Sequence, residues 1–542
     1  MINLRSYIFA CALAAAGFLA QRNPSPSPQP AAVQVSHVFE INGTVIDAAS
    51  SAPLAHARVA LEPLAAGAAQ RTTLTADDGR FAFNGLAQGA YRLSAERTGY
   101  LRQSFEQHDR YSTLVVVGPD LESGNLLFRL RRSAAISGRI TDEQNEPVRR
   151  ANVDLFQVAI FGERLTPYPH GSAITNDVGS YHFAHLPPGK YFLAVHAKPW
   201  YSTSGAASAA SVKPDGALLD VTYPIAFYSG ATDPAGAAVI NLAAGDVFTA
   251  DMTLHPVPAL RLRVSLGPAE TIQRAAIALQ QSIFGFPSQE EFWLRRVEAG
   301  IYEEAGLRPG HYIVQARSTT GKLYLREVDL ATNSEISLTE ATPTAVVSGL
   351  LRPETPAVVP TGAFVQLRNR KSQDVWIEQA SAKGEFEFKE SIPAGSYSVE
   401  VHGWPGFLFT GMVANEAKLD GQTFEVNPVV TPAVKLTLLL TQGTGEIMGV
   451  ALRENKPVSG VMIELVPQDA AHHPDLYRRN QSNTDGTFTL DAIPPGRYTL
   501  LAIQNGWDLE WANPEALKPY MARGEIVQVQ QKGKYNLKVQ AQ

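Results

Sequence analysis

Short runs of alternating apolar and polar residues recur along most of the chain. One such run, with the pattern apolar-x-Gly-x-apolar, occurs four times, at Ile41–Val45, Ile136–Ile140, Val347–Leu350 and Ile447–Val450. Alternation with a period of two predicts β-strands, because successive side chains point to opposite faces. Long amphipathic helical patterns are missing, and we expect only a short helix near Leu509 to Met521. The pattern therefore predicts an all-β chain.

A turn motif follows the opening run at a constant spacing. Counted from its first glycine, an aromatic residue falls at +2, an aliphatic residue at +7, Gly at +10 and Tyr at +12. The turn glycines are Gly79, Gly179, Gly300, Gly384 and Gly486, and the Gly384 copy has one extra residue. Glycine tolerates a positive φ, so each copy predicts a tight turn between two strands. A motif that returns in register indicates internal repeats.

Each motif ends in a strand that begins with tyrosine. These residues are Tyr91, Tyr191, Tyr312, Tyr397 and Tyr498. By analogy with the tyrosine corner of Greek-key sandwiches, we expect a buried ring with its hydroxyl bonded to backbone. Each copy holds six or seven predicted short strands in 85–120 residues, which is typical of a small β-sandwich.

The copies divide the chain into segments. We expect a signal peptide at 1–20, a Pro/Ser-rich tether at 21–36, and β-sandwiches at 37–132, 133–257, 258–342, 343–442 and 443–542. The second sandwich carries an insertion at 202–230, rich in Ala, Ser and Gly, which we interpret as a loop. The third is degenerate, because its first strand, Leu260 to Leu266, lacks the glycine.

The combined motifs resemble the carboxypeptidase regulatory-like domain, a seven-stranded transthyretin-like Greek-key sandwich. Thr484-Asp485-Gly486 with Ile493-Pro494-Pro495-Gly496-Arg497-Tyr498 carries the likeness in the fifth copy. The first, second and fifth copies match well, the fourth fairly and the third weakly. The resemblance implies a tandem array of about five such sandwiches after a signal peptide. It also implies a non-catalytic accessory module, and similar sandwiches bind carbohydrate, although a fold does not fix a function.

The composition limits the classes of partner and the cellular location that we expect for this chain. With 46 Lys+Arg and 52 Asp+Glu in 542 residues, the net charge of −6 argues against nucleic acid, which requires a basic face. The single Cys11 excludes an internal disulfide and a CxxC metal site. Arg5 precedes an apolar run, Tyr7 to Ala20, which fits a signal peptide and is short for a membrane span. We expect export to an extracellular, periplasmic or outer-surface location, and an uncleaved anchor is the alternative.

The motifs of known active sites are missing, so we expect no enzyme, no metal and no cofactor. No H-E-x-x-H, G-x-S-x-G or phosphate-binding glycine loop occurs. His37-Val38-Phe39-Glu40 matches H-x-x-E but lacks the α/β domain of zinc peptidases, and we interpret it as an entry strand. His472-His473 is interpreted as a solvated loop pair. A catalytic carboxylate pair in the third unit or in the insertion is the remaining enzyme hypothesis.

Aromatic residues follow the tyrosine strands in loops. Tyr100, Trp200, Trp404 and Trp507 lie 9, 9, 7 and 9 residues beyond the strand tyrosine, and Trp511 is four residues past Trp507. Exposed rings there would stack on sugars or partner proteins, whereas buried rings would close the end of each core. The first hypothesis is a binding module with carbohydrate as the first ligand class. The alternative is a structural spacer or protein–protein interaction array, so the candidate partners are a polysaccharide or a cell-surface protein.

Overall fold

The computed structural model describes residues 38–542 except 66, 68, 122, 162–163, 203–219, 267–271, 319–321, 355, 372–373, 405–406, 416 and 471–475. The predicted signal peptide (1–20), the tether (21–36), Cys11, His37, His472-His473 and most of the 202–230 insertion lie outside the described residues. The regular secondary structure of the described chain is almost wholly strands, with a single α-helix, α1 (Pro514–Met521). The all-β prediction is confirmed.

The strands fall into successive groups, which we call units 1 to 5. Unit 1 contains β1 (Phe39–Asp47), β2 (Arg58–Pro63), β3 (Arg71–Leu74), β4 (Arg80–Leu86), β5 (Gly89–Glu96), β6 (Gln103–Ser104), β7 (Val115–Val117) and β8 (Leu126–Leu130). Unit 2 contains β9 (Ala134–Thr141), β10 (Asn152–Phe161), β11 (Arg164–Ile174), β12 (Ser180–Leu186), β13 (Gly189–His196), β15 (Ala226–Phe227), β16 (Ile240–Leu242), β17 (Val247–Thr249) and β18 (Met252–Thr253). Beside it, β14 (Val221–Thr222) pairs with β19 (Val257–Pro258).

The remaining strands form three further groups. Unit 3 contains β20 (Leu260–Leu266), β21 (Ile272–Ile283), β22 (Phe286–Trp293), β23 (Arg295–Glu298), β24 (Ile301–Leu307), β25 (Gly310–Ser318), β26 (Leu323–Leu330) and β27 (Ser334–Leu338). Unit 4 contains β28 (Thr344–Pro353), β29 (Phe364–Asn369), β30 (Val375–Gln379), β31 (Glu385–Glu387), β32 (Ile392–Pro393), β33 (Gly395–His402), β34 (Phe407–Ala414), β35 (Leu419–Asp420), β36 (Thr423–Val426) and β37 (Ala433–Gln442). Unit 5 contains β38 (Gly445–Arg453), β39 (Lys456–Pro457), β40 (Met462–Pro467), β41 (Arg478–Gln481), β42 (Thr487–Ile493), β43 (Gly496–Ile503), β44 (Glu525–Val529), β45 (Lys534–Gln540) and α1.

The units share one sheet topology. In unit 5, β38 lies between β42 and β45, and the second sheet has the order β41-β40-β43-β44. The first strand pairs antiparallel with the strand after the turn glycine, and parallel with the last strand. The corresponding trios are β4-β1-β8, β12-β9-β17, β24-β20-β27 and β31-β28-β37. Unit 3 therefore keeps this arrangement although its first strand lacks the glycine.

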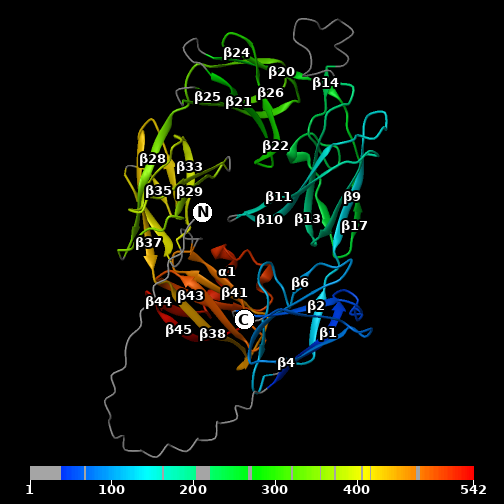
Figure 1. The fold of residues 1–542 in the computed structure, drawn as a ribbon, viewed down its shortest axis with the longest axis vertical. Coiled ribbons are helices and arrows are strands. Elements are labelled where there is room, and N and C mark those ends of the chain that lie inside the picture. Colours follow the sequence, from blue (N-terminus) through cyan, green and yellow to red (C-terminus); the bar gives the residue numbers. More distant parts are fainter. Residues whose placement is uncertain are drawn as a thin grey trace, which may run out of the picture.

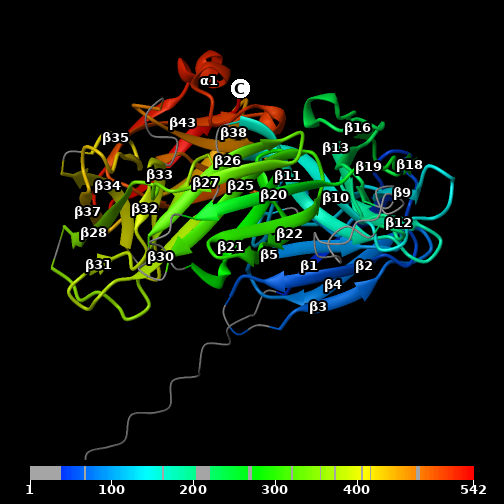
Figure 2. The same cartoon turned by 90° about the horizontal axis from the view of Figure 1, so that it is seen from above.

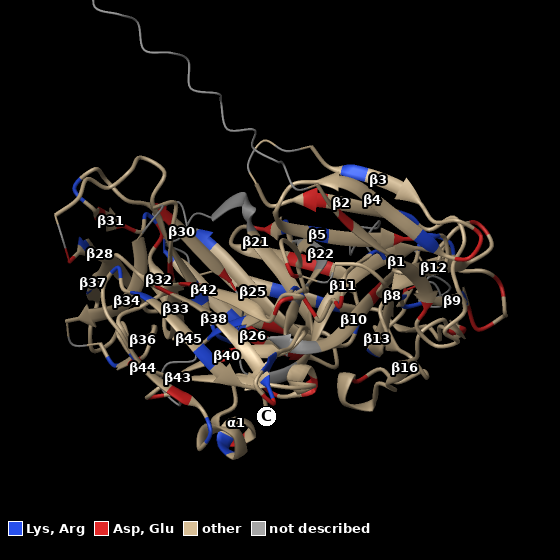
Figure 3. Cartoon of the chain, turned by 90° about the horizontal axis from the view of Figure 1, so that it is seen from below, with Lys and Arg blue, Asp and Glu red and all other residues tan. Residues whose placement is uncertain are grey.

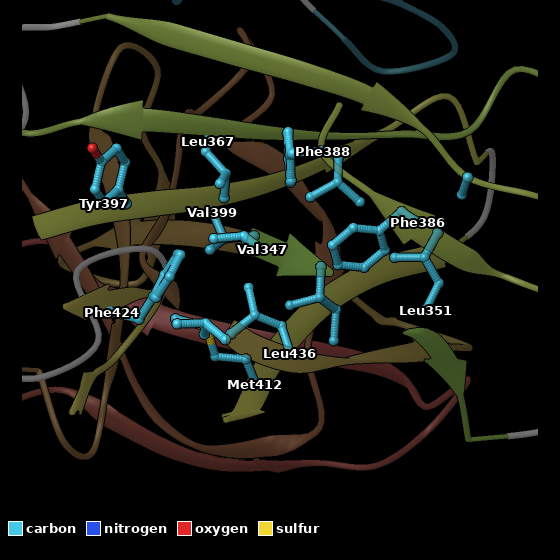
Figure 4. Close-up of a cluster of buried hydrophobic side chains, with 14 of the residues drawn as sticks. Val347, Leu351, Leu367, Phe386, Phe388, Tyr397, Val399, Met412, Phe424 and Leu436 are labelled. Atoms are coloured by element: carbon cyan, nitrogen blue, oxygen red, sulfur yellow. The ribbon is translucent and has the colours of Figure 1, made fainter. Parts of the chain in front are cut away.

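Apolar side chains from both sheets fill the core of each unit. Figure 4 shows the cluster in unit 4, where Val347 and Leu436 come from one sheet and Leu367 and Val399 from the other. All four side chains are buried. Burial of alternate residues on facing strands is what the period-two pattern predicts.

The repeated tyrosine makes the same hydrogen bond in each unit. Its hydroxyl donates a hydrogen bond to the carbonyl four residues earlier in all five copies, at 2.8, 2.7, 2.9, 2.9 and 2.9 Å for Tyr91, Tyr191, Tyr312, Tyr397 and Tyr498. The rings are buried. A buried phenol needs a partner for its hydroxyl, and the turn before the strand supplies one. The expected tyrosine corner is thus confirmed.

The first-strand glycine permits a close approach to the parallel last strand. A Cβ atom at Gly349 would overlap the carbonyl oxygen of Leu436 and approach the ring of Phe386. At Gly449 it would overlap the carbonyl oxygen of Leu537 and the ring of Phe488. The space beside the glycine is thus filled by the last strand and by the aromatic ring that follows the turn. This shared packing explains why the glycine and the aromatic residue recur together in the sequence.

Figure 1 shows the units following one another around a closed path, so that unit 5 lies beside unit 1. Turned by 90°, the molecule shows α1 on one outer side and β3 and β4 on the opposite side (Figure 2). Acidic and basic residues are interspersed over the units (Figure 3). The closed path brings together two regions that are remote in sequence.

Units 2 and 3 meet through an aromatic plug, which we call the Phe284 contact. Phe284 and Gly285 form the turn between β21 and β22, with positive φ values of 52° and 83°. The Phe284 ring lies 5.1 Å from Phe156, 5.1 Å from Phe192 and 5.4 Å from Phe227 of unit 2, centroid to centroid. A bulky residue at positive φ is strained, and packing of the partly buried ring against this cluster offsets the cost.

Candidate functional site

Two of the predicted loop aromatics are buried inside their own units. The Tyr100 hydroxyl donates to Asp47 Oδ2 at 2.8 Å, and Arg132 Nε lies 2.6 Å from the same oxygen. The Arg132 bond, with the backbone bond from Ser50, holds the pKa of the Asp47 carboxyl well below its usual range. Trp404 is buried against Phe407, with ring centroids 4.3 Å apart. Neither ring is exposed for stacking on a ligand.

Trp200 has the opposite environment. Its side chain follows β13 and is 85% exposed. The neighbouring Tyr201 ring stands perpendicular to it, 5.7 Å away, and the Tyr201 hydroxyl donates to Glu143 at 2.7 Å. Tyr201 is thus fixed in place while one face of the indole remains available.

Trp507 lies at the boundary between unit 5 and unit 1. It belongs to a 3₁₀ turn, Gly506–Asp508, and its Nε1 donates to the Gly460 carbonyl at 3.1 Å. The His108 ring of unit 1 stacks on it at 4.7 Å, with an angle of 5° between the ring planes. Tyr111 of unit 1 approaches the same indole at 5.9 Å. The Trp507 ring therefore packs between unit 5 and unit 1.

Arg479, on β41, occupies the centre of this boundary. Its guanidinium carbon lies 4.9 Å from the Tyr111 ring, 4.6 Å from Trp511 and 5.8 Å from Trp507. Its Nη2 pairs with Asp109 Oδ2 of unit 1 at 3.1 Å, and the arginine side chain is only 7% exposed. A cation that has left water is stabilised strongly by aromatic faces and by a carboxylate. Both tryptophans thus share Arg479 as a partner.

Gln481 connects the next position of β41 to unit 1. Its side-chain nitrogen donates to the Glu106 carbonyl at 2.6 Å and to Thr113 Oγ1 at 2.7 Å. Its oxygen lies 3.2 Å from His108 Nδ1. The side chain is buried, so these bonds are made away from water, where an unpaired amide would be costly.

Backbone bonds extend the boundary beyond β41. The Thr484 amide donates to the Leu114 carbonyl at 3.0 Å, and the Val116 amide donates to Thr484 Oγ1 at 2.9 Å. Residues 105–116 of unit 1 thus lie along residues 478–484 of unit 5. We call this interface, together with Trp507 and Trp511, the closing contact.

A turn in unit 1 shapes its half of the closing contact. The amides and carbonyls of His108 and Tyr111 bond to each other at 3.0 and 2.9 Å, and Asp109 takes a positive φ of 54°. Aspartate tolerates that conformation better than most residues. The turn presents the His108 and Tyr111 rings and the Asp109 carboxylate together.

Glu464 lies directly across from Arg479 in the β40–β41 pair. It is fully buried, and among the described residues neither of its carboxylate oxygens has a hydrogen-bond partner. Burial raises the pKa of Glu464 well above its usual value, while the charge of Arg479 acts in the opposite direction. Arg479 therefore stands between an internal carboxyl group and Asp109 of the other unit.

The closing contact contains few groups that are open to a substrate. Most of its rings, amides and charges are paired with one another, as expected of an interface, although Arg479 Nε is buried without a hydrogen-bond partner among the described residues. Within the described ranges, no three His, Cys, Asp or Glu side chains gather so as to hold a metal ion. The arrangement is suited to holding two units together.

Sequence reasoning identified Trp507 and Trp511 but not His108, Tyr111, Arg479 or Gln481. The offset from the strand tyrosine placed the tryptophans in a loop without showing what would cover them. One signal was present: β41 reads Arg478-Arg479-Asn480-Gln481, with no apolar residue, although it belongs to a sandwich sheet. A fully polar strand with buried members indicates polar partners from elsewhere in the chain.

The fold and the closing contact define this protein as a chain of linked β-sandwich units with an interface between the first and the last. The family model of the carboxypeptidase regulatory-like domain matches residues 40–116, within unit 1. The resemblance found in the sequence is confirmed for that unit. A comparison with curated proteins found no match.

Several solved structures are similar at low identity. The Bacillus anthracis TIE protein is 10% identical, with 93% of this chain and 74% of that chain covered and a TM-score of 0.18. A streptococcal ancillary pilin is 11% identical, with 56% and 99% covered and a TM-score of 0.21. Shaft pilin SpaA from Lactobacillus rhamnosus GG is 12% identical, with 41% and 97% covered and a TM-score of 0.19. Likenesses at this level carry no argument about the present chain.

In the part of the chain that the structure describes, no helix has both the length and the hydropathy needed to cross a bilayer. The predicted signal peptide or anchor at 1–20 lies outside that part.

Proposed function

We propose that this chain is an exported, non-catalytic scaffold of the cell envelope that holds β-sandwich units in a fixed arrangement for interaction with other proteins. The observation that supports this most is the closing contact. It fixes unit 1 against unit 5 through Arg479, which is almost fully removed from water. Four of the five predicted loop aromatics pack in a core or between units: Tyr100, Trp404, Trp507 and Trp511. Trp200 alone among the five is exposed.

A non-catalytic role is supported by the position of Glu464, a carboxyl group with a raised pKa. A raised pKa in a cleft is a common sign of a catalytic acid. Among the described residues, burial raises the pKa of two carboxyl groups: that of half-buried Glu304 in unit 3 to about 7, and that of Glu464 well above its usual value. The Glu464 side chain is fully buried. A substrate therefore has no access to it. Export is supported by the apolar run at Tyr7 to Ala20, which is typical of a signal peptide.

The scaffold proposal is tested by small-angle X-ray scattering on the full chain. A fixed closed arrangement gives a scattering curve that matches the structure and does not change with dilution. Arg479→Ala should increase the radius of gyration, while Arg92→Ala, which removes an exposed pair with Glu62 inside unit 1, should not. An extended curve for the unmodified chain would refute the fixed arrangement. Secretion of the tagged chain, with N-terminal sequencing of the exported product, tests export and cleavage.

Carbohydrate binding at Trp200 is the second candidate, because this indole is 85% exposed. A flat exposed ring suits stacking on a sugar. We would screen starch, cellulose, chitin and pectin by quenching of tryptophan fluorescence. Saturable quenching that is lost in Trp200→Ala and retained in Trp507→Phe, whose ring His108 covers, would support the role. Absence of quenching by all four polysaccharides would reject it.

A further inference from the structure

We propose that the closing contact can also form between two copies of this chain, so that unit 1 of one copy occupies the face that unit 5 of the other presents. The inference goes beyond the scaffold role, since it names a second copy of the chain as a partner. It rests on three features: the two halves of the contact differ, the unit 5 half is costly to uncover, and ion pairs at the joint between units 3 and 4 are exposed to solvent.

The two halves of the contact are different surfaces. Unit 1 contributes a turn with His108, Asp109 and Tyr111, and unit 5 contributes the polar strand β41 with Trp507 and Trp511. A contact between unlike surfaces can be satisfied within one chain or by the same surfaces on another chain. If both copies exchange at once, every bond of the closed monomer is recovered in a closed dimer.

The unit 5 half is costly to leave uncovered. Gln481 makes its hydrogen bonds to Glu106, Thr113 and His108, all from unit 1. Arg479 would lose both Asp109 and the Tyr111 ring. A chain that opens therefore regains these bonds only by closing again or by accepting unit 1 of a neighbour.

The joint between units 3 and 4 gives the contact a way to open. Arg317 of unit 3 pairs with Glu390 of unit 4 at 2.7 Å, and Lys371 of unit 4 pairs with Glu327 of unit 3 at 2.9 Å. Both pairs are exposed to solvent, so each contributes little and is weakened by salt. A short link between Leu338 and Thr344 joins the two units. In the proposed opening, units 4 and 5 turn away together.

Concentration decides between the two forms. Closure within one chain benefits from an effective concentration of about millimolar order. At low protein concentration the closed monomer should predominate. The exchanged dimer should increase when concentrated chains are opened in high salt and then returned to low salt.

Cysteine cross-linking separates the two forms. In a Cys11→Ser background, one chain carries Val116→Cys and a differently tagged chain carries Thr484→Cys, at positions joined by a 2.9 Å hydrogen bond in the closing contact. After salt-induced opening and dialysis of the concentrated mixture, exchange predicts a mixed disulfide dimer on non-reducing gels, with a yield that rises with protein concentration. The matched control pairs the Val116→Cys chain with one carrying Val358→Cys, which is exposed in unit 4.

A chain with both Val116→Cys and Thr484→Cys shows whether the cysteines can meet. If this chain forms an internal disulfide but the mixture gives no more dimer than the Val358→Cys control, exchange is refuted and the closed scaffold stands. If no internal disulfide forms in the double variant, the closing contact is itself contradicted, and the scaffold proposal and the exchange fall together.

Discussion

The Phe284 contact and the closing contact both join two units, but by different chemistry. At the first, one ring enters a cluster of three phenylalanines, so the attraction is apolar and tolerates small shifts. At the second, a guanidinium, an amide and stacked rings require particular partners at particular places. Units adjacent in sequence are held close by the chain and need only burial. Units far apart in sequence must find each other, and directional polar groups specify that pairing.

The largest expected loss of stability comes from removing the ring at the Phe284 contact. Phe284→Ala deletes the ring from the cluster with Phe156, Phe192 and Phe227, at a cost of about 3 kcal/mol in unfolding free energy. We expect the loss, measured by denaturant titration, to persist in added salt. Phe286→Ala, whose ring meets the partly exposed Tyr168 at 5.4 Å, is the control and should cost about 1 kcal/mol. Equal losses of unfolding free energy for the two variants would show that the Phe284 ring has no special role in joining units 2 and 3.

The closing contact should be broken by Arg479→Met, which keeps the apolar stem and removes the charge. Loss of the Asp109 pair and of three ring contacts should cost about 2 kcal/mol. Limited proteolysis should then cut faster within residues 105–116. Arg92→Met, at an exposed pair, should cost less than about 0.5 kcal/mol. If proteolysis of the Arg479 variant matched that of the unmodified chain, Arg479 would not hold the units together.

Glu464→Gln should remove a pH dependence that the Phe284 contact lacks. Burial raises the pKa of Glu464, so the folded chain binds this proton more tightly than the unfolded chain. Stability from this group is therefore full below the unfolded pKa and falls as pH rises, by up to about 1.4 kcal/mol per pH unit. Arg479 is the cation facing it, and Asp109 lies beyond that cation.

The measurement for Glu464 is melting temperature against pH, from acid to mildly alkaline. Glu464→Gln should flatten the fall, whereas Glu515→Gln, at an exposed carboxylate on α1, should leave the profile as it is. A profile that Glu464→Gln does not alter would mean that this proton is not linked to folding.

The smallest effect is expected for Asp109→Asn. The Asp109 side chain is 69% exposed, so its pair with Arg479 should contribute less than about 1 kcal/mol. The difference from the unmodified chain should vanish in added salt, in contrast with that of Phe284→Ala. A loss that salt does not reduce would indicate that Asp109 acts through the turn rather than through its charge.

The sequence predicted the units well because their constraints are local. Gly79 and Gly486 both take a φ of 76°, as the turn motif requires, and the tyrosine corner spans only four residues. The helix near the C-terminus forms, although it begins at Pro514, where Asn513 caps it, rather than near Leu509. Such features depend on neighbours that stand beside each other in the sequence.

The closing contact could not be predicted in that way. Asp109 and Arg479 are 370 residues apart, and no local pattern relates them. Trp200 and Trp507 have the same offset from their strand tyrosines, yet one is exposed and the other covered by His108. The difference comes from which unit lies opposite, and that follows from the path of the whole chain. The domain boundaries and the ligand role of the loop aromatics stay predictions.

The parallel pairing of first and last strands has a mechanical consequence. In unit 5, β38 and β45 run side by side in the same direction from Glu446 with Lys534 to Leu452 with Gln540. The chain thus enters a unit at one end and leaves it at the other. Tension between these two points loads the hydrogen bonds of the ladder in shear, all together, rather than peeling them one at a time. A protein that is pulled by its ends would then resist through the very strands at which each unit begins and ends.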